Sequence, residues 1–386
     1  SINIPLGFGD IETFPWALLF CLSPKLVLDR VYLYLMVAFG LSAAITVAIY
    51  GNAFAVIRSY FALLNGSLIF FRIMGTDRPE FFRLIQAMLV VFFLNIFISW
   101  IQYIGWFPAF IEPYYRMLVP RFTSESIGAG RGVGGLYAEP AYSSYAIHFM
   151  FAFMVLWWRL NPFERKGAIA FLGMLAFDLF LNKSATGTAF LVVLFVSFLD
   201  RKTLGKFVLA SLVFFAGVLW LSEYMEEPPR AVDLVNNILF TGHRLFSILS
   251  AYKYGLVHWL GGGIGSWPVS SVIAMEAMGI ESFEIYYFLE FNDGFFLGIR
   301  PTAFAAGLFL EVGIIGCAAY CFTFFRHTWH LPYRADPFWR ATFNLFLFNF
   351  FLIGTIGDPM PYITLAMAYL AMTKFQHQSA HDPSQV

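Results

Sequence analysis

Long apolar runs, separated by short clusters of charge, make up most of this chain. Residues 31–50 contain no charged side chain, and neither do the 28 residues 84–111. A helix that crosses a bilayer needs about 20 apolar residues. The pattern therefore predicts an all-α integral membrane protein. We expect spans at 31–50, 51–71, 84–111, 140–158, 167–181, 184–199, 207–222, 301–325, 341–357 and 359–373, and a shorter apolar run at 13–24 brings the expected total to about eleven.

Composition supports this interpretation. Hydrophobic residues make up 59% of the chain and charged residues 12%, with 48 Phe, whereas soluble domains carry about 25% charge. This composition excludes an ordinary soluble globule and a disordered chain. The formal net charge is zero, which argues against a nucleic-acid partner because such partners require a basic surface. The three Cys lie in apolar runs, and we expect them to be packing residues.

The loop charges predict how the chain is oriented. Of the 24 Lys and Arg, 15 fall in short loops on one side of the predicted spans and 9 on the other. The positive-inside rule assigns the richer side to the cytoplasm. The prediction is a single polytopic membrane domain over 1–375, with external loops at 106–139 and 223–300 containing short helices, and a polar cytoplasmic tail at 376–386.

The external cations point to an anionic substrate. They are Arg58, Arg116, Arg121, Arg131, Lys183, Arg230, Arg244, Lys253 and Arg300. Several lie near the glycine-rich stretches 128–135 and 261–265, where a backbone without Cβ atoms can approach a ligand closely. Guanidinium groups bind phosphate oxygens through paired hydrogen bonds. We therefore expect an external pocket for a phosphate-bearing substrate. The alternative for each Arg is a local acid or a lipid headgroup as partner.

Acidic and histidine residues supply further candidates. Glu139 lies beside Tyr142 at the start of the 140–158 span. Its expected role is that of a base, a sugar ligand or a loop anchor. Glu311 lies deep in its span, where an ionisable group is a functional candidate or a helix–helix hydrogen-bond partner. His243 neighbours Arg244, either in the site or in a plain loop role. The histidines show no metal-ligand spacing, so no metal site and no cofactor are expected.

Four segments, in order, resemble the O-antigen polymerase and ligase superfamily. They read "GVGGLYAEPAYSSYA" from 132, "NKSATGTAFLVVLFVSF" from 182, "GHRLFSILSAYKYGLVHWLGGGIGSW" from 242 and "PTAFAAGLFLEVGIIG" from 301. The ligase pattern has a His-Asn pair before the last segment, where this chain has "GIRPTAF". Polymerases of the Wzy type carry an Arg followed by ten residues and a Gly in two external loops. Arg121 with Gly132 and Arg244 with Gly255 have this spacing.

The resemblance implies a glycosyltransferase in the bacterial inner membrane with a periplasmic active site. Its donor would be a glycan on undecaprenyl pyrophosphate and its acceptor one lipid-linked repeat unit, with a chain-length regulator protein as a candidate partner. Arg131 and Arg244 are the expected catalytic ligands of the pyrophosphate, and Glu139 the expected base. Arg58, Arg121, Arg300, Tyr142 and His243 are expected to bind substrate. The alternatives are an O-antigen ligase and a lipid-linked sugar transporter.

Overall fold

The computed structural model describes most of the N-terminal third and of the C-terminal part of the chain. The residues described are 25–104, 133–136, 181–182, 185–199, 243–278, 289–292, 295–298, 300–328, 337–352 and 356–375, together with 22, 143, 146, 206 and 354. This part is predominantly helical. Four of its helices are long and apolar enough to cross a membrane: α2 (Arg30–Tyr50), α3 (Ala53–Met74), α4 (Arg78–Tyr103) and α15 (Phe304–Thr328).

These four helices confirm as helical most of the predicted spans 31–50, 51–71 and 301–325, and the part of the predicted span 84–111 that runs to Tyr103. Residues 105–111 lie outside the described residues. Helices α9 (Ala185–Phe198) and α17 (Met360–Leu370) fall in two further predicted spans, and α16 (Pro337–Leu352) overlaps the predicted span 341–357 but begins four residues before it. A π-helical turn, η2 (Ala371–Phe375), follows α17. The predicted spans 13–24, 140–158, 167–181 and 207–222 lie outside the described residues, apart from a few isolated positions. The total of about eleven therefore stays a prediction.

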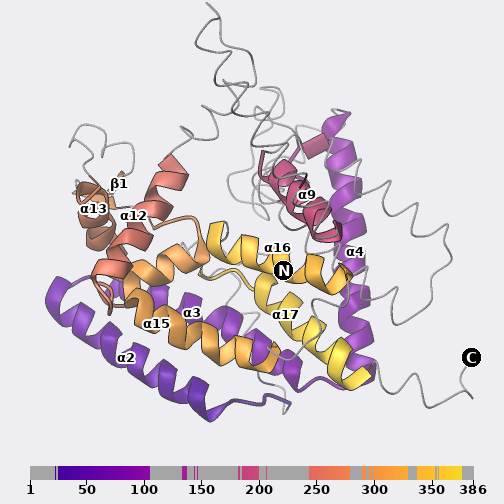
Figure 1. Cartoon of the computed structure of the whole chain (residues 1–386), viewed down its shortest axis with the longest axis horizontal. Helices are drawn as coiled ribbons and strands as arrows, with labels where there is room; N and C mark the ends of the chain where they lie inside the picture. The colour runs from indigo at the N-terminus through magenta and orange to yellow at the C-terminus, as the bar shows by residue number, and fades with distance from the viewer. Residues whose placement is uncertain are drawn as a thin grey trace, which may run out of the picture.

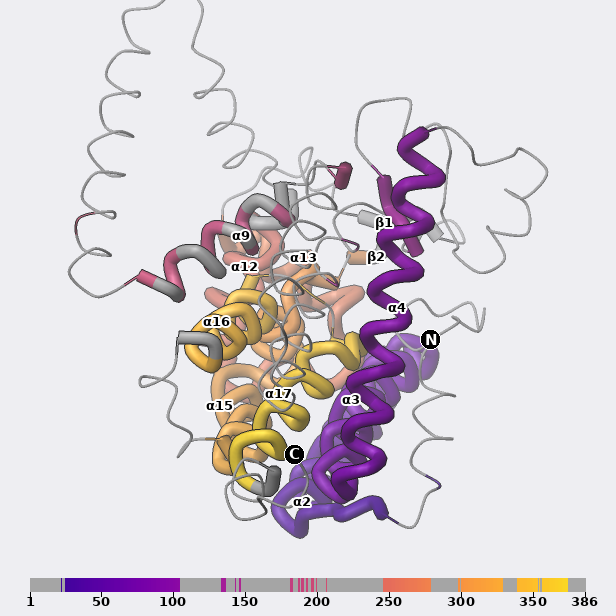
Figure 2. Tube along the Cα trace, turned by 90° about the vertical axis from the view of Figure 1, so that its right-hand side faces the viewer, coloured from indigo at the N-terminus to yellow at the C-terminus, as the bar shows by residue number. Residues whose placement is uncertain are grey.

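The predicted external loop 223–300 has more structure than the sequence indicates. Helices α12 (His243–Val257) and α13 (Trp267–Glu276) are short helices of the kind expected there. Strands β1 (Leu289–Asn292) and β2 (Phe295–Gly298) pair as an antiparallel hairpin. This hairpin departs from the predicted all-α fold. Figure 2 shows it close to α12 and α13, at one end of the longer helices.

Side-chain caps fix where the first helices begin. The carboxylate of Asp29 accepts the Val31 N–H at the start of α2, and the Asn52 amide oxygen accepts the Ala55 N–H at the start of α3. Asp77 caps α4, which begins several residues before the uncharged run because Pro79 fits the first turn of a helix. A left-handed Gly51, with φ of 69°, ends α2 and allows the tight turn into α3.

The helices form a bundle with an aromatic core. Helix α3 packs on α2 and α17, and α15 packs on α2, α12 and α16; Figure 1 shows α2 and α15 side by side, with α12 and α13 at one end of them. Phe70 of α3 meets Phe324 of α15 edge to face, with ring centroids 5.1 Å apart. The buried hydroxyls of Tyr320 and Tyr362 hydrogen-bond and join α15 to α17.

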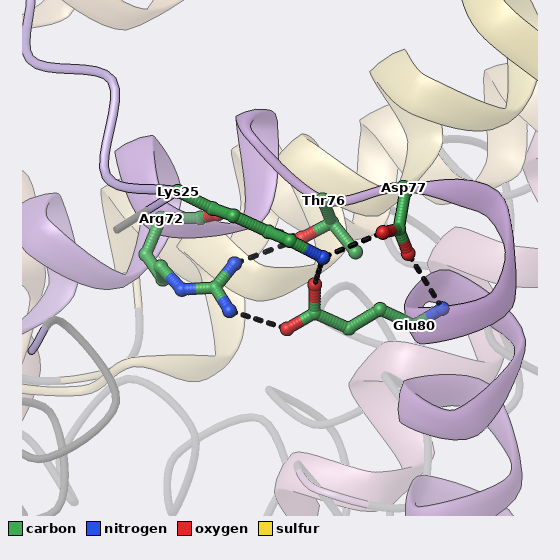
Figure 3. A network of polar contacts seen from close by, with 5 residues as sticks. All are labelled: Lys25, Arg72, Thr76, Asp77 and Glu80. Atoms are coloured by element: carbon green, nitrogen blue, oxygen red, sulfur yellow. Dashed lines mark hydrogen bonds and ion pairs between the residues drawn. The ribbon is translucent and has the colours of Figure 1, made fainter. Parts of the chain in front are cut away.

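Charged side chains from the loops predicted to be cytoplasmic gather at one end of the bundle, here called the Lys25 end. Lys25 Nζ lies 2.5 Å from Asp77 Oδ2 and 3.0 Å from Glu80 Oε2, and Arg72 pairs with the same Glu80 carboxylate (Figure 3). Arg326, at the end of α15, pairs with Asp29. The opposite end of the helices, which holds Gly51 and Arg300, is here called the Arg300 end. Which end faces the cytoplasm stays a prediction.

The Lys25–Asp77 pair predicts a pH dependence. Its hydrogen bond lowers the pKa of Asp77 below the ordinary 3.8 and raises that of Lys25. A carboxylate with a lowered pKa stabilises the fold above its ordinary pKa, and this contribution is lost as the pH falls through the folded-state value. We expect Asp77→Asn, which keeps a capping side chain, to be slightly less stable than the parent at pH 7 and equally stable well below pH 3.8. Thermal unfolding in detergent measures this difference, and in a Lys25→Met background it should be much smaller.

Candidate functional site

A break in α15 organises the Arg300 end of the bundle. Gly313 has φ of 65° and ψ of −172°, a conformation that interrupts the helix and that only glycine adopts readily. In an uninterrupted helix the Ile315 N–H would donate to the Glu311 carbonyl. Here it donates to the Trp259 carbonyl instead, at 3.2 Å.

The loop between α12 and α13 fills the gap that this break leaves. Gly262 N donates to the Leu310 carbonyl at 2.9 Å, and Gly263 N donates to the Glu311 carbonyl at 2.8 Å. The loop backbone therefore replaces part of the hydrogen-bond ladder of α15. Insertion of such a group is a known cause of a helix break.

Glycines make this close approach possible. A Cβ atom on Gly261 would lie 2.5 Å from Gly313 N, and one on Gly265 would lie 2.4 Å from Val56 Cα of α3. Both glycines have a left-handed φ, of 69° and 81°. The sequence predicts that such a stretch lets the backbone approach a ligand. In the structure, the backbone at 261–265 approaches the neighbouring helices.

The Glu311 carboxylate is the centre of a buried polar cluster. Its side chain is fully buried, and Oε1 accepts from Arg300 Nη2 at 2.5 Å, from Arg300 Nε at 3.2 Å and from Ser59 Oγ at 3.1 Å. Oε2 accepts from Gly265 N at 3.2 Å, and Arg300 Nη2 also donates to Ser59 Oγ at 2.6 Å. The cluster joins α3, the glycine loop and the segment that leads into α15.

Glu311 of α15 thus accepts a hydrogen bond from Ser59 of α3, which is the helix–helix contact expected as one of its two possible roles. Arg300 is only 8% exposed and bonds two protein groups. In this arrangement its guanidinium positions Glu311 and Ser59, and a direct contact to substrate stays a prediction.

Arg58 lies next to this cluster, one residue before Ser59 on α3. Its guanidinium carbon lies 5.5 Å from the ring centroid of Trp267, a cation–π distance. Trp267 is 7% exposed and begins α13. Its Nε1 and the Oγ of Ser271, one turn later, are buried with no hydrogen-bond partner within the described part of the chain. Arg58 thus precedes on α3 the serine that Arg300 hydrogen-bonds, while its own guanidinium lies over Trp267.

A second set of polar contacts binds the end of the glycine-rich stretch 128–135. Gln102 of α4 accepts from Gly135 N at 2.9 Å and donates to its carbonyl at 3.1 Å. Asn95 Oδ1 accepts from Leu136 N at 2.8 Å, and its Nδ2 donates to Ser143 Oγ at 3.3 Å. These amides fix the backbone a few residues before Glu139. The spacing of Asn95, Ser99 and Gln102 on one helix face was a usable sequence signal.

The structure does not describe the side chains of the other predicted site residues. His243 and Arg244 form the first turn of α12, and the structure describes their backbone alone. Arg121, Arg131, Glu139 and Tyr142 lie outside the described residues. Within the described ranges, no three His, Cys, Asp or Glu side chains gather closely enough to hold a metal ion. The expectation of a metal-free site stays untested.

Comparison with known proteins does not identify a relative. No family model, no curated protein and no solved structure matches the chain. The family resemblance therefore rests on the four sequence segments alone.

Proposed function

We propose that the chain is a Wzy-type polymerase, which lengthens a lipid-linked polysaccharide at the periplasmic face of the bacterial inner membrane. The observation that carries this proposal is the contact between two of the family-like segments. Gly262, Gly263 and Gly265 of the third segment donate backbone hydrogen bonds to Leu310 and Glu311 of the fourth. This contact between two of the four family-like segments supports the proposal.

The proposed reaction transfers a glycan from undecaprenyl pyrophosphate to a sugar hydroxyl of the acceptor. The bond from the sugar anomeric carbon to the pyrophosphate oxygen breaks, and a bond from that carbon to the acceptor oxygen forms. Arg131 and Arg244 would stabilise the negative charge on the departing pyrophosphate, as preorganised donors do. Glu139 would take the acceptor proton. Arg58, held over Trp267, is the described arginine that best fits a supporting contact to the pyrophosphate.

A second candidate is a lipid-linked sugar transporter, and the broken helix α15 favours it. Membrane transporters build substrate sites from interrupted helices, and α15 is interrupted at Gly313 next to a buried ion pair. The sequence favours the polymerase, because Arg58, Arg131, Arg244 and Arg300 all fall on the predicted external side of the spans, whereas a transport path would need charges that reach both faces.

Lipid analysis of a deletion strain separates the candidates. Loss of a polymerase leaves single repeat units capped on lipid A core. Loss of a ligase leaves polymer on undecaprenyl pyrophosphate, and loss of a transporter removes every external repeat unit. Either of the last two results would contradict the proposal.

The arginines provide a direct test of the mechanism. We expect Arg131→Ala and Arg244→Ala each to lower the polymerisation rate about 10²–10³-fold, the cost of removing one donor that stabilises developing negative charge. Lys at either position should restore little, because its point charge does not replace the planar guanidinium. The assay incubates purified protein with lipid-linked repeat units and measures the length of polymer formed over time.

Arg30→Ala is the matched control, because Arg30 starts α2 at the Lys25 end of the bundle. It should leave polymer length unchanged. Normal polymer in both the Arg131 and Arg244 variants would show that neither guanidinium binds the pyrophosphate.

A further inference from the structure

The turn between α12 and α13 has an apolar surface. Leu256, Val257, Trp259 and Leu260 are 53%, 66%, 65% and 74% exposed. The 22 residues between Lys253 and Glu276 include no Asp, Glu, Lys or Arg. Soluble surfaces rarely expose large contiguous apolar patches. Yet the charge pattern of the sequence assigns this segment to an external loop.

This turn contacts α2 and α15 well inside their ends, about two turns of helix from the Arg300 end of the bundle. Gly263 bonds the carbonyl of Glu311, which lies seven residues into α15, and Ile264 N donates to Ser42 Oγ, eight residues before the end of α2. At 1.5 Å of rise per residue, both contacts lie about 10–12 Å inside the helix ends. Helices α2 and α15 are both candidate membrane spans. The turn therefore reaches the depth of their apolar segments.

The N–H groups of the irregular backbone from Gly261 to Ser266 are all bound by protein acceptors. These acceptors are the carbonyls of His258, Leu310, Glu311 and Gly263 and the side chains of Ser42 and Glu311. Non-helical backbone is tolerated at membrane depth only where the protein satisfies it in this way, since lipid offers no hydrogen bonds.

A polar contact marks the opening of this hairpin. Lys253 Nζ donates to the Ala277 carbonyl at the end of α13, at 2.8 Å. A cation at a helix C-terminus also interacts favourably with the helix dipole. Glu276 lies beside it and is exposed. Charged and polar groups therefore sit at the open end, and the apolar surface lies at the turn.

We propose that residues 254–276 form a re-entrant hairpin, which enters the leaflet at the Arg300 end and whose turn contacts lipid acyl chains. The turn continues the exposed apolar face of α2, where Leu41 and Ile45 are exposed and the neighbouring Ser42 bonds the turn. The hairpin thus brings the glycine loop to the buried Glu311 from within the membrane. This proposal does not depend on the polymerase function.

Fluorescence quenching in nanodiscs tests it, because both faces of a nanodisc are open to water. Single cysteines replace Leu260 or Val257 in a chain in which Cys21, Cys317 and Cys321 have been changed to Ala, and each is labelled with bimane. Leu41→Cys on α2 is the lipid-facing control, and Ala277→Cys at the hairpin opening is the aqueous control. Brominated acyl chains quench a label in lipid, and iodide quenches a label in water.

We expect the labels at Leu260 and Val257 to lose as much fluorescence to brominated lipid as the label at Leu41, and to resist iodide. The label at Ala277 should show the reverse. If iodide quenches Leu260 and Val257 as strongly as Ala277, and brominated lipid leaves them unchanged, the hairpin lies in water and the proposal is wrong. Substitution at Leu260 should be tolerated, because 74% of the residue is exposed.

Discussion

Glu311→Gln is expected to destabilise the protein by about 3–5 kcal/mol, the cost of removing one partner of a buried ion pair. Glu311 is fully buried and Arg300 is 8% exposed, so the remaining guanidinium would have little access to water. The neutral amide would also place an NH₂ donor among groups that now donate to the carboxylate, from Arg300, Ser59 and Gly265. Unfolding in mixed micelles with increasing dodecyl sulfate measures the change.

Two variants check that the loss comes from the unpaired charge. The double variant Glu311→Gln/Arg300→Met should recover part of the lost stability, because replacing both partners removes the uncompensated charge. Glu276→Gln on exposed surface should change stability by less than about 0.5 kcal/mol. If Glu311→Gln unfolds at the same detergent fraction as Glu276→Gln, the cluster does not stabilise the fold.

The positions of the main helices follow from the sequence, because a membrane span needs a long apolar run and few charges interrupt these runs. Arg58 did not prevent the prediction of α3. The structure supplies the physical reason, since its guanidinium lies over Trp267. The start of α4 was placed too late, since the uncharged run begins after Arg83 and the helix begins at its Asp77 cap.

The contacts of the site could not be predicted in the same way. The sequence identifies 261–265 as glycine-rich, but it does not show which surface the glycines approach. That depends on a break at Gly313, which in the sequence is one of three glycines in the apolar run 301–325. The hairpin β1–β2 was missed although the sequence carries a signal for it, since Asp293-Gly294 between the two short runs is typical of a two-residue hairpin turn.

The described contacts differ between two of the predicted site residues. Arg300 is expected to bind substrate, and in the structure it hydrogen-bonds Glu311 and Ser59. A direct contact to substrate stays a prediction. Arg58 has a different environment, because it is only partly buried and its described contact is with an aromatic face. If the polymerase proposal is correct, Arg300 acts by positioning the glycine loop and Arg58 by approaching the pyrophosphate.

Gly313→Ala is the second change for which we expect a large effect. The conformation at Gly313 costs a residue with a Cβ about 1–3 kcal/mol. The added methyl group would also lie 2.2 Å from the Trp259 carbonyl oxygen and 2.5 Å from Gly261 N. Ala favours the helical conformation that would close the break, and a continuous α15 would use the carbonyls that now accept from Gly262 and Gly263. We expect lower stability and release of the loop, measured by dodecyl sulfate unfolding and by faster proteolysis within 258–266.

Gly40→Ala provides the matched control, because it is the same substitution in another apolar helix. Its Cβ would meet nothing closer than 3.5 Å, at the Tyr60 hydroxyl. Replacing a helical glycine by Ala stabilises a helix by up to about 1 kcal/mol, so this variant should be at least as stable as the parent. If Gly313→Ala is as stable as Gly40→Ala, then α15 tolerates closure of the break. In that case the break at Gly313 does not hold the glycine loop in place. Loss of stability in Gly313→Ala alone would show that the break, rather than the general flexibility of glycine, holds the loop against Glu311.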